Sequence, residues 1–234
     1  MKFVTFFCCI LIFSRCAAPL KIVNYQAKAP EVFTAASLAG LLNGPGAPSV
    51  MVRAIDRVDK NENIRESTFG QIYSAIENVL LKEGFTVRDR TLFNKIANST
   101  GPTDYSKLKD ITGTDLILEI INIDPAAVYS TNTITLAYKK HQKKQVQDIS
   151  YRRYGAAAAY RLIIVKNNEI AGVYKYNYNP CANGCETDSF SFEKKNALQT
   201  VSGQPVPGER LVEFISQSIR DMVRSARVAS LQQP

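Results

Sequence analysis

The stretch TDLILEIINID, residues 114–124, decides the fold class of this chain, because it is nearly all apolar from Leu116 to Ile123. A strand with one face in water alternates polar and apolar residues, whereas an uninterrupted apolar run is typical of a strand buried on both faces of a sheet. We therefore predict a central strand at this position, with the rest of the domain arranged around it.

The segments before this strand predict two further strands and a helix. Residues 49–55 (SVMVRAI) alternate in polarity, as a strand does. Residues 68–84 (TFGQIYSAIENVLLKEG) predict an amphipathic helix with a capping box of Thr68 and Gln71 at its start and a glycine stop at its end. Residues 85–88 (FTVR) predict a second short strand.

Two aspartates are expected to cap helices. Asp89 lies between Arg88 and Arg90, just before a helix expected near Thr91. The flanking arginines favour its ionised form, and the positive end of a helix dipole favours it further. Asp104 precedes the next helix in the same way. Both residues are therefore predicted to serve folding, not catalysis.

The segments after the central strand predict a sheet extension and a closing helix. Residues 133–137 (TITLA) predict an edge strand, and 139–148 (KKHQKKQVQD) a basic loop or hairpin. Residues 156–165 and 169–178 predict two strands joined by an Asn-Asn turn, because asparagine tolerates positive φ. Apolar residues at helical spacing over 211–227 predict an amphipathic helix.

The element order indicates an α/β fold: a single domain with a mixed β-sheet, flanking helices and a C-terminal amphipathic helix. We expect this domain to span 49–228. It would follow a tether at 17–48, with a short helix near 33–42, and precede a tail at 229–234.

Residues 1–16 (MKFVTFFCCILIFSRC) have the pattern of a secretory signal, with Lys2 before an apolar run that is too short to span a bilayer. We therefore expect an exported protein. Cys16 follows the run as the acylated cysteine of a bacterial lipoprotein does, and lipidation at Cys16 is predicted. Arg15 stands where a small residue is usual, so cleavage without lipid is the alternative.

Cys181 and Cys185 lie close together in NPCANGCE. In an exported chain such a pair favours a disulfide, with a free pair as the alternative. A metal site would need further ligands, and the single histidine, His141, is isolated among lysines. We therefore expect neither a metal nor a cofactor.

Tyr174, Tyr176 and Tyr178 share one face of a predicted strand, and Arg161 lies on its partner strand. Tyrosine and arginine are enriched at interfaces, so these four residues are candidates for partner binding. The alternative is a cross-strand ladder of tyrosines. The chain has a formal net charge of +8 without a dense basic stripe. For an exported protein, nucleic acid is the least expected partner.

The sequence predicts no catalytic residues and no small-molecule substrate. Asp56, Asp89 and Asp115 lie near strand ends, where catalytic carboxylates often occur. Asp89 is nevertheless a poor proton donor between two arginines, and a nucleophile–histidine pair would have to use His141.

Four stretches resemble envelope lipoproteins of the CsgG type, which include curli secretion proteins and penicillin-binding-protein activators. They are GFTVRDRTLFNKI (84–96), DYSKLKDITGTDLILEI (104–120), the strand hairpin YRLIIVKNNEIAGVYKY (160–176) and ERLVEFISQSIRDMVRS (209–225). The resemblance implies a non-enzymatic cell-envelope protein that assembles with itself or docks on another envelope protein, on the periplasmic face of the outer membrane. A pore-forming subunit of a curli-type exporter and an enzyme acting on envelope polymers are the alternatives.

Overall fold

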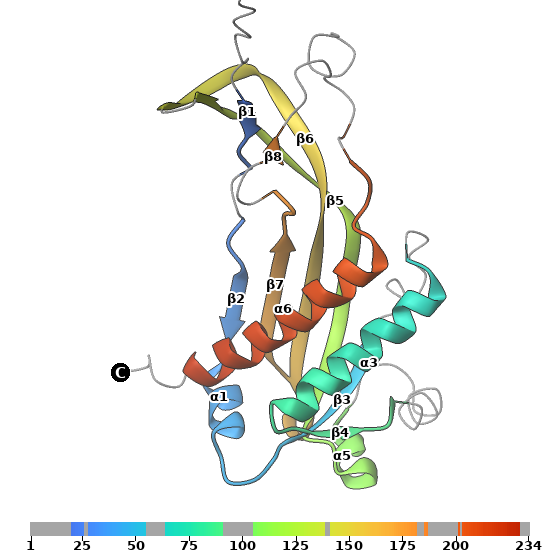
Figure 1. The fold of residues 1–234 in the computed structure, drawn as a ribbon. Coiled ribbons are helices and arrows are strands. Elements are labelled where there is room, and N and C mark those ends of the chain that lie inside the picture. Colours follow the sequence, from blue (N-terminus) through green and yellow to red (C-terminus); the bar gives the residue numbers. More distant parts are fainter. Residues whose placement is uncertain are drawn as a thin grey trace, which may run out of the picture.

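The computed structural model describes residues 20–25, 28–54, 64–90, 105–138, 141–181, 185–186, 201 and 203–229. In this part of the chain a single mixed sheet is flanked by helices, and a long helix closes the fold at its C-terminal end (Figure 1). The predicted fold class is therefore confirmed.

The strands are β1 (Leu20–Val23), β2 (Glu31–Thr34), β3 (Ser49–Ala54), β4 (Thr86–Arg88), β5 (Leu116–Tyr138), β6 (His141–Ile164), β7 (Glu169–Tyr178) and β8 (Cys185–Glu186). The helices are α1 (Ala36–Leu42), α3 (Glu66–Lys82), α5 (Ser106–Thr112) and α6 (Gly208–Val228), with one 3-10 turn, η1 (Val165–Asn167).

The body of the sheet has the strand order β4-β3-β5-β6-β7-β2. Strand β3 is parallel to both β4 and β5, whereas β5, β6, β7 and β2 pair in antiparallel fashion. The apolar run that begins β5 thus lies between β3 and β6 in the middle of the sheet. This position explains why Leu116, Ile117 and Leu118 are all buried, although their side chains alternate between the two faces.

Helices α3 and α6 cover one face of the sheet (Figure 1). Both helices have apolar residues at helical spacing, and these side chains form the main core together with apolar residues of β3, β5, β6 and β7 on one face of the body of the sheet. Tyr160 of β6 reaches α6, where its hydroxyl lies 2.7 Å from the Ser218 hydroxyl. The opposite face carries a smaller cluster of Met51, Ile117 and Ile163 with neighbouring side chains.

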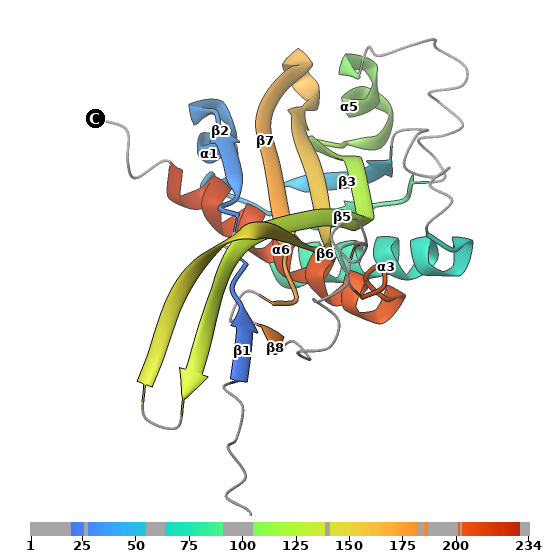
Figure 2. The same ribbon diagram turned by 90° about the horizontal axis from the view of Figure 1, so that it is seen from above.

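Strands β5 and β6 continue far beyond the body of the sheet as a two-stranded arm, residues 129–138 and 141–154 (Figure 2). Strand β1 lies along this arm, with Val23 opposite Ile134 and Leu20 opposite Ala137. Strand β8 in turn pairs with β1. The first described residues of the chain are therefore held at the arm and not at the body of the domain.

The segment 17–48, expected as a tether, instead contributes β1, β2 and α1 to the fold. Strands of four residues are too short to show a clear alternation of polar and apolar residues. The sequence pattern therefore does not indicate β1 and β2. The predicted edge strand 133–137 belongs to the arm, but it is not an edge, because it lies between β1 and β6. Of the predicted basic loop or hairpin 139–148, residues 141–148 belong to β6, and 139–140 lie outside the described residues. The predicted Asn-Asn turn lies in the loop after β6, but this loop is longer than two residues, because Ile164 pairs with Glu169 and Val165–Asn167 form η1. Asn168 has the expected positive φ, 53°.

The predicted capping box is wrong. Helix α3 begins at Glu66, and Arg65 occupies the N-cap position without a side-chain hydrogen bond. Thr68 lies inside the first turn, beside Gly208 at the start of α6. The predicted glycine stop is correct, because Gly84 follows the helix with a φ of 87°.

Gly155 marks the base of the arm, where β6 leaves β7. A Cβ atom at this position would lie 2.3 Å from the carbonyl oxygen of Tyr178 and 2.5 Å from the ring of Tyr129. Gly155→Ala should therefore lower the free energy of unfolding by about 2–4 kcal/mol, since backbone or ring must shift to admit a methyl group. Urea unfolding followed by circular dichroism measures this change.

Gly70→Ala is the matched control. Gly70 lies inside α3 with open space around its Cβ position, so the same substitution should stabilise the protein by about 1 kcal/mol through helix propensity. Equal effects of the two substitutions would show that Gly155 is not sterically required.

Candidate functional site

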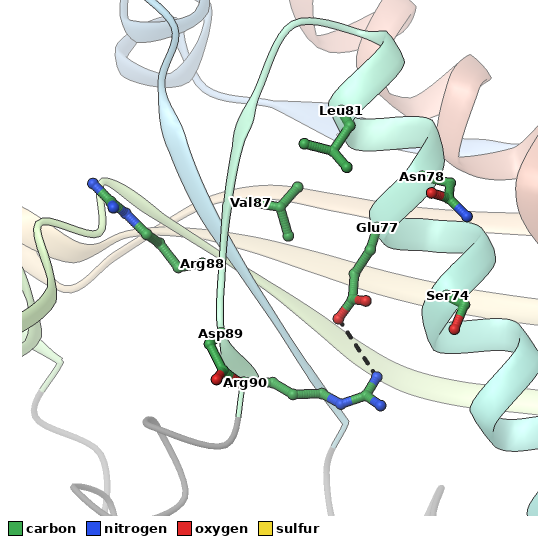
Figure 3. Close-up of a pocket in the computed structure, with 8 residues that line it drawn as sticks. All are labelled: Ser74, Glu77, Asn78, Leu81, Val87, Arg88, Asp89 and Arg90. Atoms are coloured by element: carbon green, nitrogen blue, oxygen red, sulfur yellow. Dashed lines mark hydrogen bonds and ion pairs between the residues drawn. The ribbon is translucent and has the colours of Figure 1, made fainter.

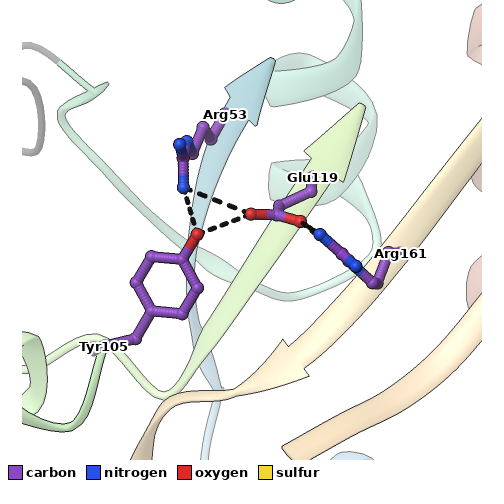
Figure 4. A network of polar contacts seen from close by, with 4 residues as sticks. All are labelled: Arg53, Tyr105, Glu119 and Arg161. Atoms are coloured by element: carbon purple, nitrogen blue, oxygen red, sulfur yellow. Dashed lines mark hydrogen bonds and ion pairs between the residues drawn. The ribbon is translucent and has the colours of Figure 1, made fainter. Parts of the chain in front are cut away.

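A buried carboxylate lies at the centre of the sheet, on the face opposite α3 and α6 (Figure 4). Glu119 of β5 is 1% exposed. One of its oxygens accepts hydrogen bonds from the Tyr105 hydroxyl at 2.6 Å and from Arg53 Nη1 at 3.3 Å. The other oxygen accepts from Arg161 Nε at 2.8 Å and also from Arg161 Nη2. Both carboxylate oxygens are therefore occupied.

The sheet register brings these residues together from distant parts of the sequence. Arg53 of β3 lies directly opposite Glu119 of β5, which lies directly opposite Arg161 of β6. Residues opposite each other in a sheet point to the same face, so the carboxylate sits between the two guanidinium groups. Tyr105, just before α5, completes the network. Its hydroxyl also accepts a hydrogen bond from Arg53 Nη1, and the Cζ atom of Arg53 lies 5.7 Å from the centre of the Tyr105 ring.

Burial raises the pKa of Tyr105 to about 12, and the hydrogen bond that its hydroxyl donates to Glu119 contributes to the increase. Tyr105 therefore stays protonated and acts as a fixed donor. The two arginines hold the charge of Glu119 in place, while about a third of each arginine side chain stays exposed. The network thus stabilises the sheet and presents guanidinium edges to the solvent, and it lacks a free base for proton transfer.

Asp115 has a second structural role, at the start of β5. Its carboxylate accepts hydrogen bonds from the main-chain N–H and the hydroxyl of Ser49, at 2.9 and 2.7 Å, and pairs with Lys109 at 3.4 Å. Burial alone would raise the pKa of Asp115, but the bonds from Ser49 and the charge of Lys109 outweigh burial and lower it. Asp115 therefore fastens the first residues of β3 and β5 together.

Asp89 lies at the other end of the parallel strands, directly after β4. It lines an open pocket of about 600 Å³ between β4 and α3, together with Val87, Arg88 and Arg90 (Figure 3). Arg90 in this pocket pairs with Glu77 at 3.5 Å and lies over the ring of Tyr73. Asp89 and Asp115 follow and precede their strands respectively, so they do not line a common cleft.

Tyr174 and Tyr176 do not form a partner-binding surface, because they are buried under α6 in the main core. Their shared strand face was predicted correctly, but it is the inner face. Tyr178 is partly buried and its ring centre lies 5.6 Å from that of Phe214. Arg161 is the one member of this predicted set that keeps an exposed part on the face opposite α3 and α6.

Other predicted site residues lie partly or wholly outside the described residues. Cys181 is buried and disulfide-bonded. Nothing is described of the Cys185 side chain, so the pairing of Cys181 with Cys185 stays a prediction. Cys16, Asp56 and Asp104 lie wholly outside the described residues. Within the described residues, no group of acidic, histidine and cysteine side chains could hold a metal ion.

No helix in the described part of the chain is both long and apolar enough to cross a membrane.

Sequence reasoning missed Glu119, the residue around which the polar network is built. Its signal was available, because a single charge inside the apolar run of β5 must have partners if that strand is buried.

Comparison with known proteins identifies no family. No protein-family model matches the chain, and no curated protein is similar to it in sequence. Two solved structures show a weak likeness. A PelC dodecamer from Paraburkholderia phytofirmans is 10% identical, with 88% of this chain and 98% of that chain covered and a TM-score of 0.36.

The second is a homolog of the neuraminyllactose-binding hemagglutinin from Helicobacter pylori. It is 11% identical, with 81% of this chain and 93% of that chain covered and a TM-score of 0.35. Similarity at this level supports no inference about function, and membership of the CsgG-like group stays a prediction.

Glu119→Gln should lower the free energy of unfolding by about 3 kcal/mol, because it leaves two partly buried arginines without a counter-charge. Glu77→Gln is the control, since its pair with Arg90 is more exposed and should contribute less than about 1 kcal/mol. Chemical denaturation of both variants measures the two values. A loss for Glu119→Gln as small as that of the control would show that the network does not stabilise the sheet.

Asp115→Asn should destabilise the protein in a pH-dependent way. The pKa of Asp115 is lower in the folded state than its ordinary value of 3.8, so its ionised form stabilises the fold above that pH. This contribution, about 1–2 kcal/mol from the lost hydrogen bonds, disappears as the pH falls below 3.8 toward the folded-state pKa. Unfolding curves of wild type and variant should therefore differ at neutral pH and converge in acid.

Proposed function

We propose that this chain is a non-enzymatic lipoprotein of the cell envelope that acts by binding another envelope protein or further copies of itself. The observation that carries the proposal is a row of residues across the open face of the sheet. In order along the row, it consists of Phe33, Val173, Arg161, Glu119 and Arg53, each directly opposite the next.

One end of this row is apolar and exposed. Phe33 is 57% exposed and Val173 is 41% exposed, and Ile170 adds a further exposed apolar side chain on β7. The other end consists of the two arginines around Glu119. Exposed apolar side chains beside arginine are the composition that protein–protein interfaces favour, and isolated domains seldom expose them together. We call this surface the open face.

The polar groups near the strand ends support a non-enzymatic role. Asp115 is engaged by Ser49 and Lys109, and Glu119 by Tyr105 and two arginines. A general acid or base must be able to exchange its proton with a substrate, which these saturated carboxylates are not arranged to do. The arm also disfavours the pore-forming alternative, because consecutive Lys143 and Lys144 point to its two opposite faces.

The experiment that tests the proposal is capture of the partner through the open face. With a photoreactive residue in place of Val173, we expect a cross-linked product in intact cells, either with another envelope protein or with a second copy. Phe33→Asp should reduce this product at least tenfold, because a charge at the apolar end would have to be desolvated on binding. Leu81→Asp is the control, since Leu81 is equally exposed on α3, in the other layer.

The membrane anchor is tested in the same cells. Labelling with a fatty-acid analogue should mark the wild type and leave Cys16→Ala unmarked. An unmarked wild type would contradict the lipoprotein, and a cross-link unaffected by Phe33→Asp would contradict the open face. Turnover of an envelope polymer by the purified protein would contradict the non-enzymatic role.

A further inference from the structure

The N-terminal segment joins the fold at the tip of the arm. Leu20, the first described residue, pairs with Ala137, and Tyr138 pairs with His141 at the end of the hairpin. Cys16 is only four residues before Leu20, and four residues of fully extended chain span at most about 14 Å. A lipid attached at Cys16 therefore holds the tip of the arm close to the bilayer.

The sequence from 139 to 153 carries most of the net charge of the chain. Residues 139–153 contain four lysines, two arginines and one aspartate, a formal charge of +5 out of +8 for the whole chain. The strand opposite, from 125 to 138, has no charged residue. Of these basic residues, Lys143, Lys144, Arg152 and Arg153 belong to β6, which is the outer strand of the arm on the side away from β1.

Three side chains near the tip are arranged for contact with a surface. Lys143 and Lys144 are exposed, and in the described part of the chain neither forms an ion pair. Val146, on the same face as Lys144, is 71% exposed. An exposed apolar side chain beside unpaired lysines is the combination that favours the headgroup region of a bilayer.

We propose that the tip of the arm is a second membrane contact that approaches the headgroup region end-on, with Lys144 and Val146 on one face and Lys143 on the other, so that both lysines bind anionic headgroups. A basic patch close to a lipid anchor is a common second contact with an anionic bilayer. Attachment at Cys16 keeps lipid headgroups at a high effective concentration around the tip of the arm. A soluble acidic polymer has no such attachment, so lipid is the favoured ligand. The inference rests on the proposed membrane location but does not depend on the open face.

The test compares the binding of the full-length protein to two kinds of vesicle: phosphatidylcholine alone, and phosphatidylcholine mixed with phosphatidylglycerol. The N-terminal attachment is the same for both kinds of vesicle, so the ratio of the two affinities isolates the effect of charge. We expect a clear preference for the anionic vesicles that weakens with added salt. The double variant Lys143→Gln/Lys144→Gln should reduce this preference about 30-fold, from about 1 kcal/mol for each lysine near the surface.

Lys82→Gln/Lys166→Gln is the matched control. Both lysines are exposed and lie at the opposite end of the sheet, in the last turn of α3 and in η1, so the net charge changes equally. This variant should keep the wild-type preference. Equal preference in the two double variants would overturn the proposal, because net charge alone would then explain binding. Displacement by soluble glycerol phosphate would also overturn it, in favour of a phosphate site.

A second measurement locates the tip directly. An environment-sensitive dye attached through Val146→Cys should shift to shorter wavelength on anionic vesicles, whereas the same dye attached through Lys166→Cys should not. Equal shifts or none at Val146→Cys would show that the arm does not reach the lipid. An anionic preference that persists in Cys16→Ala would support the arm even if the acyl label were absent, so failure of the lipoprotein and failure of the arm can be told apart.

Discussion

The burial of one carboxylate between two arginines is the interaction on which the body of the sheet depends. Burying an ion costs several kcal/mol, and this cost is recovered only where partners are close and well oriented. Glu119 meets that condition because Arg53 and Arg161 lie directly opposite it on the two neighbouring strands. A shift of either strand by one residue would move its arginine to the apolar face, so the network also fixes the register.

The elements that could be predicted from the sequence are those whose periodicity extends over many residues. The helices α3 and α6 belong to this group, because one face of each is apolar over several turns. The start of β5 belongs to it as well, because its residues are apolar on both faces of the strand. Strands β1 and β2 have only four residues each and are held by pairing with distant strands. Such pairing depends on the whole sheet, so local pattern does not indicate it.

The candidate site could be predicted only in part, for a related reason. A period of two placed Tyr174 and Tyr176 on one face correctly, but periodicity does not say which face is covered by α6. Tyrosine is ambiguous here because its ring is apolar and its hydroxyl is polar. Phe33 was overlooked because its neighbour on the open face, Val173, is 140 residues away in the sequence and is brought beside it only by the β2–β7 register.

The long hairpin separates the two surfaces of the protein. From Val128 to Tyr138 the chain advances ten residues, which corresponds to about 33 Å in an extended strand. With the tip at the bilayer, the body of the domain would stand clear of the headgroups, and the open face would be accessible to a protein in the periplasm. Because β5 belongs both to the arm and to the Glu119 network, the same strand links membrane contact to the rigid part of the fold. Gly155 lies where the pairing of β6 with β7 ends, and so marks the junction between the arm and the body of the sheet.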